Sequence, residues 1–420
     1  MKLLNWIALA PPRRSPGLFP ALLALGFLAC GPAVARAQSV VTTGAEPAPV
    51  AVATGGQGET TTSTTAAAPL APFQWGPVAF RPHVFYSFSY GDGIQSQPGN
   101  QRKTALHTLS PGVLMQIGHR WTVDYTPIFK FYSNDAFSNT LDHDLSITGF
   151  ASATDLTIQL SDNFSHTSDP LIETGRQTTR TNNSTAVVAS YALSRRTRLV
   201  TTLSQNLDFV ENSPNSYVWG IQTMAHYQFS ERVDVGAGLG YGYVMVDPGT
   251  DMTYLRPNVR IGWRPTAKLG FDVHAGAEQR TFRQQGAARL NTPTWGGSAS
   301  YQPFETTSIS VTTDRSVTAS YFSNQVNENT SWGINLSQRL LEHFRLSGGV
   351  THRKTRYIAT SGSLPVGRSD ETYSYNARLS TRFLQRGSIA VFYRRTHNDS
   401  NLNLFAFTSN QIGCEIGFRY

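Results

Sequence analysis

Apolar side chains recur at every second position, in runs of about ten residues, from Phe80 to the end of the chain. The clearest run places Val233, Val235, Ala237, Leu239, Tyr241, Tyr243 and Met245 against Asp234, Gly236, Gly238, Gly240, Gly242 and Val244. A period of two puts two such sets on opposite faces of a β-strand. Roughly ten residues is also the length that a tilted strand needs to cross a bilayer. The pattern therefore favours membrane-spanning strands.

The spacing of these runs predicts about eighteen strands, joined by connections of two kinds. The strands are expected to start near residues 80, 105, 121, 143, 155, 184, 198, 216, 232, 253, 267, 294, 306, 329, 343, 372, 387 and 410. Short turns such as 118–120, 194–197 and 230–231 alternate with longer loops such as 91–104, 167–183 and 357–371. Such alternation, with an even strand number, predicts an all-β transmembrane up-and-down antiparallel barrel with both termini on the short-turn side.

Solvent explains why a barrel is expected in place of a soluble sheet. Backbone groups in hydrocarbon must all be paired, which requires closure, whereas the inner surface of a wide barrel meets water. Polar and charged residues here share a face with Gly and Ser, as such a wall requires. A β-propeller would show a repeated blade signature, which is absent, and a β-sandwich adhesin is the other soluble alternative. No run of about 18 apolar residues occurs, which excludes a transporter made of several helices.

The first 72 residues show sequence features of export and of a linker, and not the alternation of the strands. Lys2, Arg13 and Arg14 precede an apolar run from Leu18 to Ala29, and Ala35-Arg36-Ala37 supplies small residues for cleavage. We therefore expect a signal peptide at 1–37, cleaved after Ala37. A lipidated Cys30 is an alternative, although Phe27-Leu28-Ala29 is a poor lipobox. Residues 38–72 are rich in Ala, Thr and Pro and predict a flexible linker, which leaves 73–420 for the barrel.

Charge and cysteine content exclude several function classes. The formal net charge is +8, but the basic residues are scattered, so nucleic acid is not an expected partner. Of the two cysteines, Cys30 lies in the expected signal peptide and Cys414 is left alone. No disulfide framework and no cysteine metal site is therefore available. We expect neither a metal nor a cofactor.

The C-terminal segment carries the most specific motif. Its last residues place Ile412, Cys414, Ile416, Phe418 and Tyr420 on one face and end the chain on an aromatic residue. This resembles the C-terminal strand signal of Gram-negative outer-membrane barrels, which the barrel-assembly machinery recognises; Tyr420 stands where Phe is more usual. The layout of 73–420 is similar to the porin-like barrels, including the β-barrel porin 2 family. The resemblance implies a location in the outer membrane, in contact with its lipid and lipopolysaccharide, and small hydrophilic solutes as cargo.

If the apolar set faces lipid, the opposite set lines the lumen. On the C-terminal half we expect a basic strip of Arg339, Arg345, Arg353, Arg378, Arg382 and Arg394 without an inward carboxylate among them. The turn at Leu341 predicts that Arg339 and Arg345 face each other, which needs water or a bound anion to screen them. Arg256, Arg260, Asp272 and Glu278 are also expected to line the pore, with Arg260 and Asp272 paired. The alternative is that all of these charges pair across strands and merely hydrate the wall.

A barrel of about eighteen strands is wide enough for an aqueous channel unless something folds inside it. The loop from His166 to Asn183, with Asp169, Glu173, Arg176 and Arg180, is the candidate constriction, and a loop exposed to the medium is the alternative. We therefore expect a porin-like channel with passive or weakly anion-selective diffusion of small hydrophilic solutes, saccharides among them.

Other functions remain open at this point. Within the porin resemblance, export of exopolysaccharide is an alternative, and a closed adhesive or enzymatic barrel is another. No nucleophile motif accompanies His143 or His166, so we expect no enzyme and no catalytic residues. The oligomeric state is left undetermined by the sequence.

Overall fold

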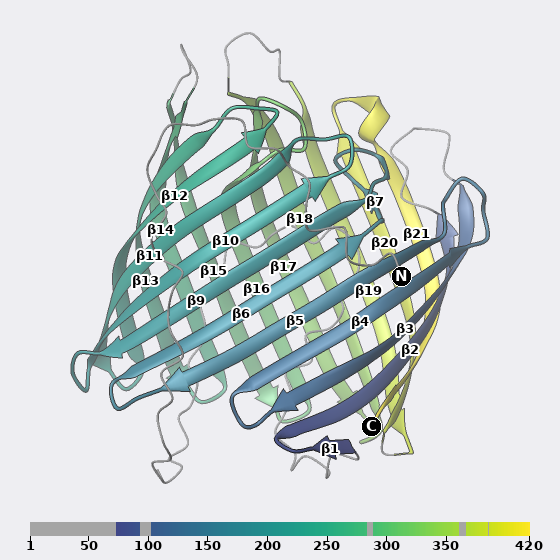
Figure 1. Ribbon diagram of the computed structural model, residues 1–420, viewed down its shortest axis with the longest axis horizontal. Helices are drawn as coiled ribbons and strands as arrows, with labels where there is room; N and C mark the ends of the chain where they lie inside the picture. Colours follow the sequence, from purple (N-terminus) through teal and green to yellow (C-terminus); the bar gives the residue numbers. More distant parts are fainter. Residues whose placement is uncertain (1–72, 93–101, 284–288, 361–366, 385) are drawn as a thin grey trace. The chain divides into compact units, whose positions relative to one another are not determined.

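Each long strand pairs antiparallel with its neighbours in the chain, and the last one pairs with the first. This is a computed structural model that describes residues 73–92, 102–283, 289–360, 367–384 and 386–420. The pairing of β2 with β21 closes eighteen long strands into an up-and-down barrel (Figure 1). The expected barrel architecture is confirmed. The expected signal peptide (1–37) and linker (38–72) lie outside the described residues.

The strands begin close to where the alternation predicted. The first half comprises β1 (Phe73–Trp75), β2 (Val78–Asp92), β3 (Lys103–Ile117), β4 (Trp121–Tyr132), β5 (Thr140–Ser152), β6 (Leu156–Thr167), β7 (Pro170–Leu171), β8 (Arg176–Gln177), β9 (Arg180–Ala192), β10 (Thr197–Val210) and β11 (Asn215–Ser230). The second half comprises β12 (Val233–Asp247), β13 (Met252–Thr266), β14 (Leu269–Phe282), β15 (Arg289–Phe304), β16 (Thr307–Ala319), β17 (Gln325–Leu340), β18 (Phe344–Ala359), β19 (Ser369–Phe383), β20 (Gly387–Ser400), the 3-10 helix η1 (Asn403–Phe405) and β21 (Phe407–Arg419). Short β1 adds to β2 at the short-turn end, and β7 pairs only with β8.

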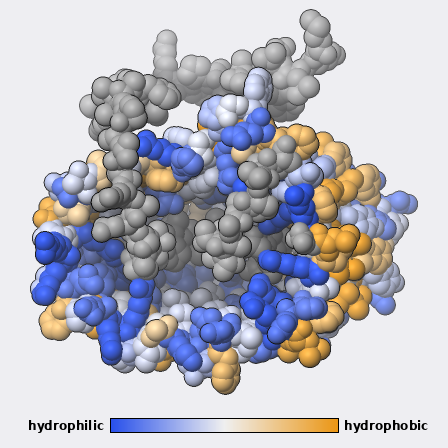
Figure 2. All heavy atoms as spheres, turned by 90° about the horizontal axis from the view of Figure 1, so that it is seen from below, coloured by the Kyte–Doolittle hydropathy of each residue, from blue (hydrophilic) through white to orange (hydrophobic). Residues whose placement is uncertain are grey.

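The two faces of the wall separate apolar from polar side chains, as the period of two requires. Leu239 and Val259 are outward and 52% and 54% exposed, whereas the inward Glu278 is 1% exposed. Seen from the short-turn side, hydrophilic side chains ring the central hollow and hydrophobic ones gather on the outside (Figure 2). The exterior thus suits hydrocarbon and the interior suits water. Among the described residues, no helix is long and apolar enough to cross a membrane.

One hairpin tip separates from β15 and folds inward, while its β17 strand stays paired with β18. The register between β15 and β16 ends at the pair Trp295–Arg315, while β16 and β17 continue to pair with each other up to Ala319–Val326. Beyond that point Arg280, on the inner face of β14, donates to the Val317 carbonyl at 2.8 Å. We call residues 316–328 the inward tip.

Apolar packing holds the inward tip against the inner wall. Val317 and Val326 of the tip lie in one buried cluster with Val244, Met252 and Phe282 of β12, β13 and β14. Burial of such side chains contributes about 1.5–3 kcal/mol each. This packing differs from what the alternation predicts, because a period of two places Val317 and Val326 on the outer face.

Candidate functional site

A loop between β6 and β9, residues 168–179, is fixed to the wall at its base; we call it the crossing loop. Lys130 on β4 contacts Asp169 at 2.5 Å and Asp142 on β5 at 2.7 Å. Gln177 accepts the backbone N–H of Ser138 at 2.9 Å and donates to its carbonyl at 3.0 Å. The loop is therefore held on both of its arms next to β4 and β5.

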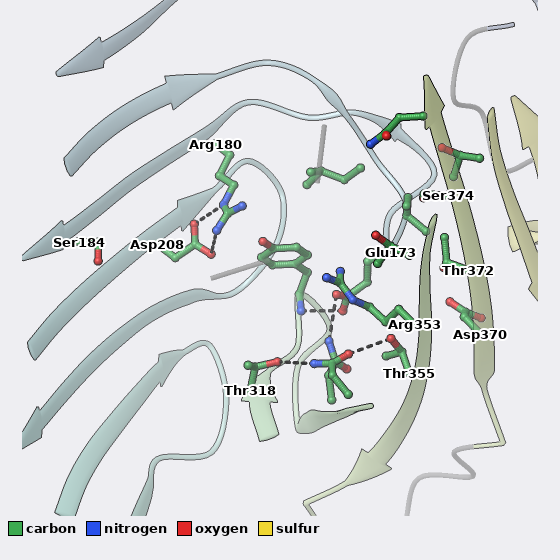
Figure 3. Close-up of a pocket in the computed structure, with 18 of the residues that line it drawn as sticks. Glu173, Arg180, Ser184, Asp208, Thr318, Arg353, Thr355, Asp370, Thr372 and Ser374 are labelled. Atoms are coloured by element: carbon green, nitrogen blue, oxygen red, sulfur yellow. Dashed lines mark hydrogen bonds and ion pairs between the residues drawn. The ribbon is translucent and has the colours of Figure 1, made fainter. Parts of the chain in front are cut away.

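The middle of the crossing loop reaches the inward tip. Ser320 Oγ donates to Glu173 Oε1 at 2.6 Å, and the backbone N–H of Tyr321 donates to the same oxygen at 2.9 Å. Asn327 Nδ2 donates to the other oxygen at 3.0 Å. Because β6 and β9 lie half-way round the strand order from β16 and β17, these bonds join opposite walls across the lumen (Figures 1 and 3).

Burial shapes the electrostatics of the crossing loop. Desolvation raises the pKa of Glu173 above its usual range, against the three donors and Arg368, which favour the charged form. Desolvation likewise raises the pKa of Asp169, and Lys130 opposes that shift. Both carboxyls thus lie where an unpaired charge would be costly.

Two arginines brace the region around Glu173. Arg180 makes a bidentate pair with Asp208, at 2.6 and 2.9 Å, and its guanidinium lies 5.5 Å from the Tyr321 ring. Arg368 pairs with Asp370 at 2.6 Å and donates to the Glu173 carbonyl at 3.0 Å. Paired and hydrogen-bonded guanidinium groups of this kind fix geometry as well as charge. Figure 3 shows Glu173 lying between the Arg180–Asp208 pair and Asp370.

Beside the crossing loop lies a chamber of about 730 Å³. Hydroxyl and amide side chains dominate the inward residues that line it, among them Ser184, Ser204, Asn206, Ser216, Ser308, Ser310, Asn335, Ser337, Ser347, Thr351, Thr355, Thr372, Ser374, Asn376 and Thr396. Its cationic groups include Arg353 and Arg394. The chamber is therefore lined mainly by polar, uncharged side chains, and residues 170–173 of the crossing loop form part of its boundary.

Five of the six arginines of the expected basic strip are unpaired within the described part of the chain. Arg339 and Arg345 are opposite each other in register, as expected. Among the residues that the structure describes, no carboxylate lies within 4.0 Å of either one, or of Arg353, Arg382 or Arg394. The nearest acidic neighbour of Arg353 in register is Asp314, two strands away across Ser331.

Arg378 departs from the expected strip. Its Nη1 lies 2.6 Å from Glu415 Oε2 on β21, so the expectation that no inward carboxylate lies among these arginines is wrong there. The two strands are separated by β20, whose Ala390 is opposite Glu415 in register. A small side chain at that point leaves room for the pair to form across the intervening strand.

The other expected pore-lining residues point inward and are paired. Arg260 Nη2 lies 2.5 Å from Asp272 Oδ2, as expected. Glu278 is shared by Arg256 at 2.5 Å and Arg280 at 2.7 Å. The alternative of charges that pair across strands therefore holds for this part of the wall.

The candidate constriction residues divide between loop and wall. Asp169 and Glu173 belong to the crossing loop and make the contacts described above. Arg176 lies on β8 and is exposed. Arg180 differs from the expectation, because β9 begins at that residue and Arg180 is part of the wall.

The C-terminal residues lie on the closing strand. Ile412, Cys414, Ile416 and Phe418 face outward on β21, which forms the seam with β2, and Tyr420 follows them. The Tyr420 N–H donates to the Pro82 carbonyl at 3.0 Å, and Arg386 lies over its ring at 4.1 Å. The chain end is thus fixed to the base of the barrel.

The histidines that a catalytic interpretation would need lie on the outer wall. His143 and His166 are opposite in register, and His143 Nδ1 is 2.9 Å from the Tyr125 hydroxyl. Within the described residues, no group of three His, Cys, Asp or Glu side chains is placed to hold a metal ion.

Sequence reasoning missed the partners of Glu173. Ser320, Tyr321, Asn327 and Arg368 lie more than 140 residues from Glu173 along the chain. No local pattern marks them, because their meeting depends on the separation of the inward tip from β15.

Comparisons with known proteins find similarity to solved structures alone. No family model and no curated protein matches this sequence. Among solved structures, Pseudomonas aeruginosa OccK2 (OpdF), crystallised with glucuronate, is 9% identical with a TM-score of 0.45, covering 81% of this chain and 97% of that one. Acinetobacter baumannii OccAB3 is 10% identical with a TM-score of 0.44, covering 81% and 99%. Scores this low leave the function to be argued from the lumen itself.

Proposed function

We propose that this protein is an outer-membrane pore for small hydrophilic solutes. The observation that carries the proposal is the combination of an apolar outer wall with a wet chamber beneath a loop that crosses the lumen. A closed barrel of eighteen strands leaves room for water inside. The crossing loop, docked through Glu173, then sets the narrowest passage.

The lining favours polar solutes without strong charge selection. Hydroxyl and amide groups can exchange hydrogen bonds with water or with the hydroxyls of a saccharide. Most inward charges are paired, which limits the net field. Small sugars therefore belong to the expected cargo.

A weak preference for anions is the finer part of the proposal. Arg353 and Arg394 line the chamber, and Arg339, Arg345 and Arg382 lie towards the short turns on neighbouring strands, each without an ion-pair partner among the described residues. A water-filled passage lined by one sign of charge raises the local concentration of the opposite ion. The pairing of Arg378 with Glu415 weakens this effect without removing it.

Assembly is expected to use the closing strand. The outward row on β21 that ends in Phe418 and Tyr420 supports recognition by the barrel-assembly machinery. Phe418→Ala should lower the amount of heat-modifiable, folded barrel in outer membranes. An equal amount of folded protein would count against that role.

Reversal potentials in a potassium chloride gradient across planar bilayers test the pore and its selectivity together. The proposal predicts open channels with a small shift toward chloride. Clear cation preference would reject the anion preference, and the lack of any current from folded protein would reject the pore. Liposome swelling in isosmotic monosaccharide would then test the saccharide cargo.

A further inference from the structure

A row of polar side chains crosses the outer, lipid-facing side of β6, β9 and β10. Asp162, Thr185 and Gln205 are successive register partners on these strands, and Asn183 lies beside them on β9. Their outward direction follows from register, since the same faces carry Leu160 and Phe164 on β6 and Leu203 and Leu207 on β10. We call these four residues the polar row. Figure 1 shows β6, β9 and β10 side by side on the near wall.

Asp162 lies where lipid chains are expected. It is the seventh of the twelve residues of β6, between Leu160 and Phe164 on the outer face. Two other outward carboxylates, Glu371 and Asp399, lie near the upper ends of β19 and β20. An ionisable group at mid-depth on a lipid-facing wall is costly, so it indicates a function or a partner.

The wall itself satisfies Asp162 only in part. Thr185 Oγ1 donates to Oδ1 at 2.5 Å, and Asn183 Nδ2 donates to the same oxygen at 3.2 Å. Among the described residues, Oδ2 has no hydrogen-bond donor and no cation lies within 4.0 Å of the carboxylate. The Gln205 amide also has no partner within that part of the chain. The row thus presents an acceptor on β6 and a donor on β10.

We propose that the polar row is the centre of an interface with a second copy of this chain. Any occupant at this depth must span the membrane and carry polar groups at the same height. A second copy related by a two-fold axis along the membrane normal meets both conditions automatically. With the axis near Thr185 on the central strand, each Asp162 lies on the side where the partner copy carries Gln205. Each copy thus brings its acceptor to the side of the axis on which its partner carries a donor.

Cysteine cross-linking tests the position of this axis. In a Cys414→Ser background, Thr185→Cys should form a disulfide-linked dimer in outer membranes under mild oxidation. Val350→Cys, outward on β18 half-way round the barrel, is the matched control and should stay monomeric. Equal cross-linking of both variants, or of neither, would overturn the proposal.

The mass of the protein in mild detergent tests the chemistry of the row. Native mass spectrometry should find a dimer for the unchanged chain. The double variant Asp162→Leu, Gln205→Leu should associate at least about tenfold more weakly, while heat-modifiable migration shows that its barrel is folded. A monomeric unchanged chain, an undiminished dimer in the double variant, or a different protein bound at this face would overturn the proposal. None of these readouts depends on conductance.

Discussion

The Glu173 carboxylate accepts the backbone N–H of Tyr321 at 2.9 Å, although the two residues belong to segments rooted in opposite walls of the barrel. Ser320 and Asn327 add two further donors from the same inward tip. One partly buried side chain thus docks the crossing loop.

Glu173→Ala should loosen the passage. The variant loses hydrogen bonds to a charged acceptor, worth roughly 1.5–3 kcal/mol each when made. We expect a larger and noisier single-channel conductance in planar bilayers. Arg176→Ala, an exposed position of the same loop, is the matched control and should behave like the unchanged chain. Identical conductance for both variants would show that the loop does not limit flow.

Docking of the crossing loop should depend on pH through Glu173. Because burial raises the pKa of Glu173, the docked loop holds a proton more tightly than the undocked loop. Docking is therefore favoured at acid pH, and this contribution is lost as the pH rises from the ordinary glutamate range through the raised value. We expect lower conductance in acid than at neutral pH.

The groups that face Glu173 decide whether this pH dependence of conductance can be attributed to Glu173 itself. Arg368 and the tip donors favour the charged form, and the pKa of Tyr321 is raised by burial well beyond this range. Glu173→Gln should therefore abolish the acid dependence. A pH response that survives in the variant would assign it to another group, such as Asp169.

The unpaired lumen arginines should account for the anion preference. Arg394 and Arg395 are adjacent on β20 but point inward and outward respectively, which supplies a matched pair. Arg394→Gln should lower the chloride-to-potassium permeability ratio by up to about fivefold, the effect of about 1 kcal/mol at 4 Å in water. Arg395→Gln should leave the ratio unchanged. Equal effects would place the selectivity elsewhere.

Glycines on the inner face of β12 should differ in their tolerance of a methyl group. A Cβ on Gly242 would lie 2.2 Å from the Tyr254 ring, whereas one on Gly240 would meet its nearest neighbour at 3.6 Å. Gly242→Ala should destabilise the barrel by about 1–3 kcal/mol in urea unfolding from detergent. Gly240→Ala should change the free energy of unfolding little. If Gly242→Ala changes it equally little, Tyr254 must move aside freely, and the expected clash does not occur.

The period of two predicted most of the fold because a lipid-facing wall constrains every second side chain. Local alternation and turn position predict where the strands start. They also predict the opposed Arg339 and Arg345 and the Arg260–Asp272 pair. Alternation alone does not show that the inward Tyr254 lies between two arginines, Arg256 and Arg280, at 5.3 and 5.7 Å from its ring. Gly242, opposite it in register, makes that room.

What alternation could not predict are contacts that skip strands or cross the lumen. Arg378 meets Glu415 over an intervening strand, and Glu173 meets a tip that has separated from β15. Asp162 is visible in the sequence as a polar interruption of an apolar face, but its meaning depends on the register that puts Gln205 in the same row.

Single-channel recording from the purified, folded barrel in planar bilayers tests the central claim most directly. An apolar exterior around a wet chamber predicts discrete, stable current steps that persist at low voltage. Folded protein that inserts into the bilayer, shown by heat-modifiable migration of the recovered sample, but never conducts would contradict it.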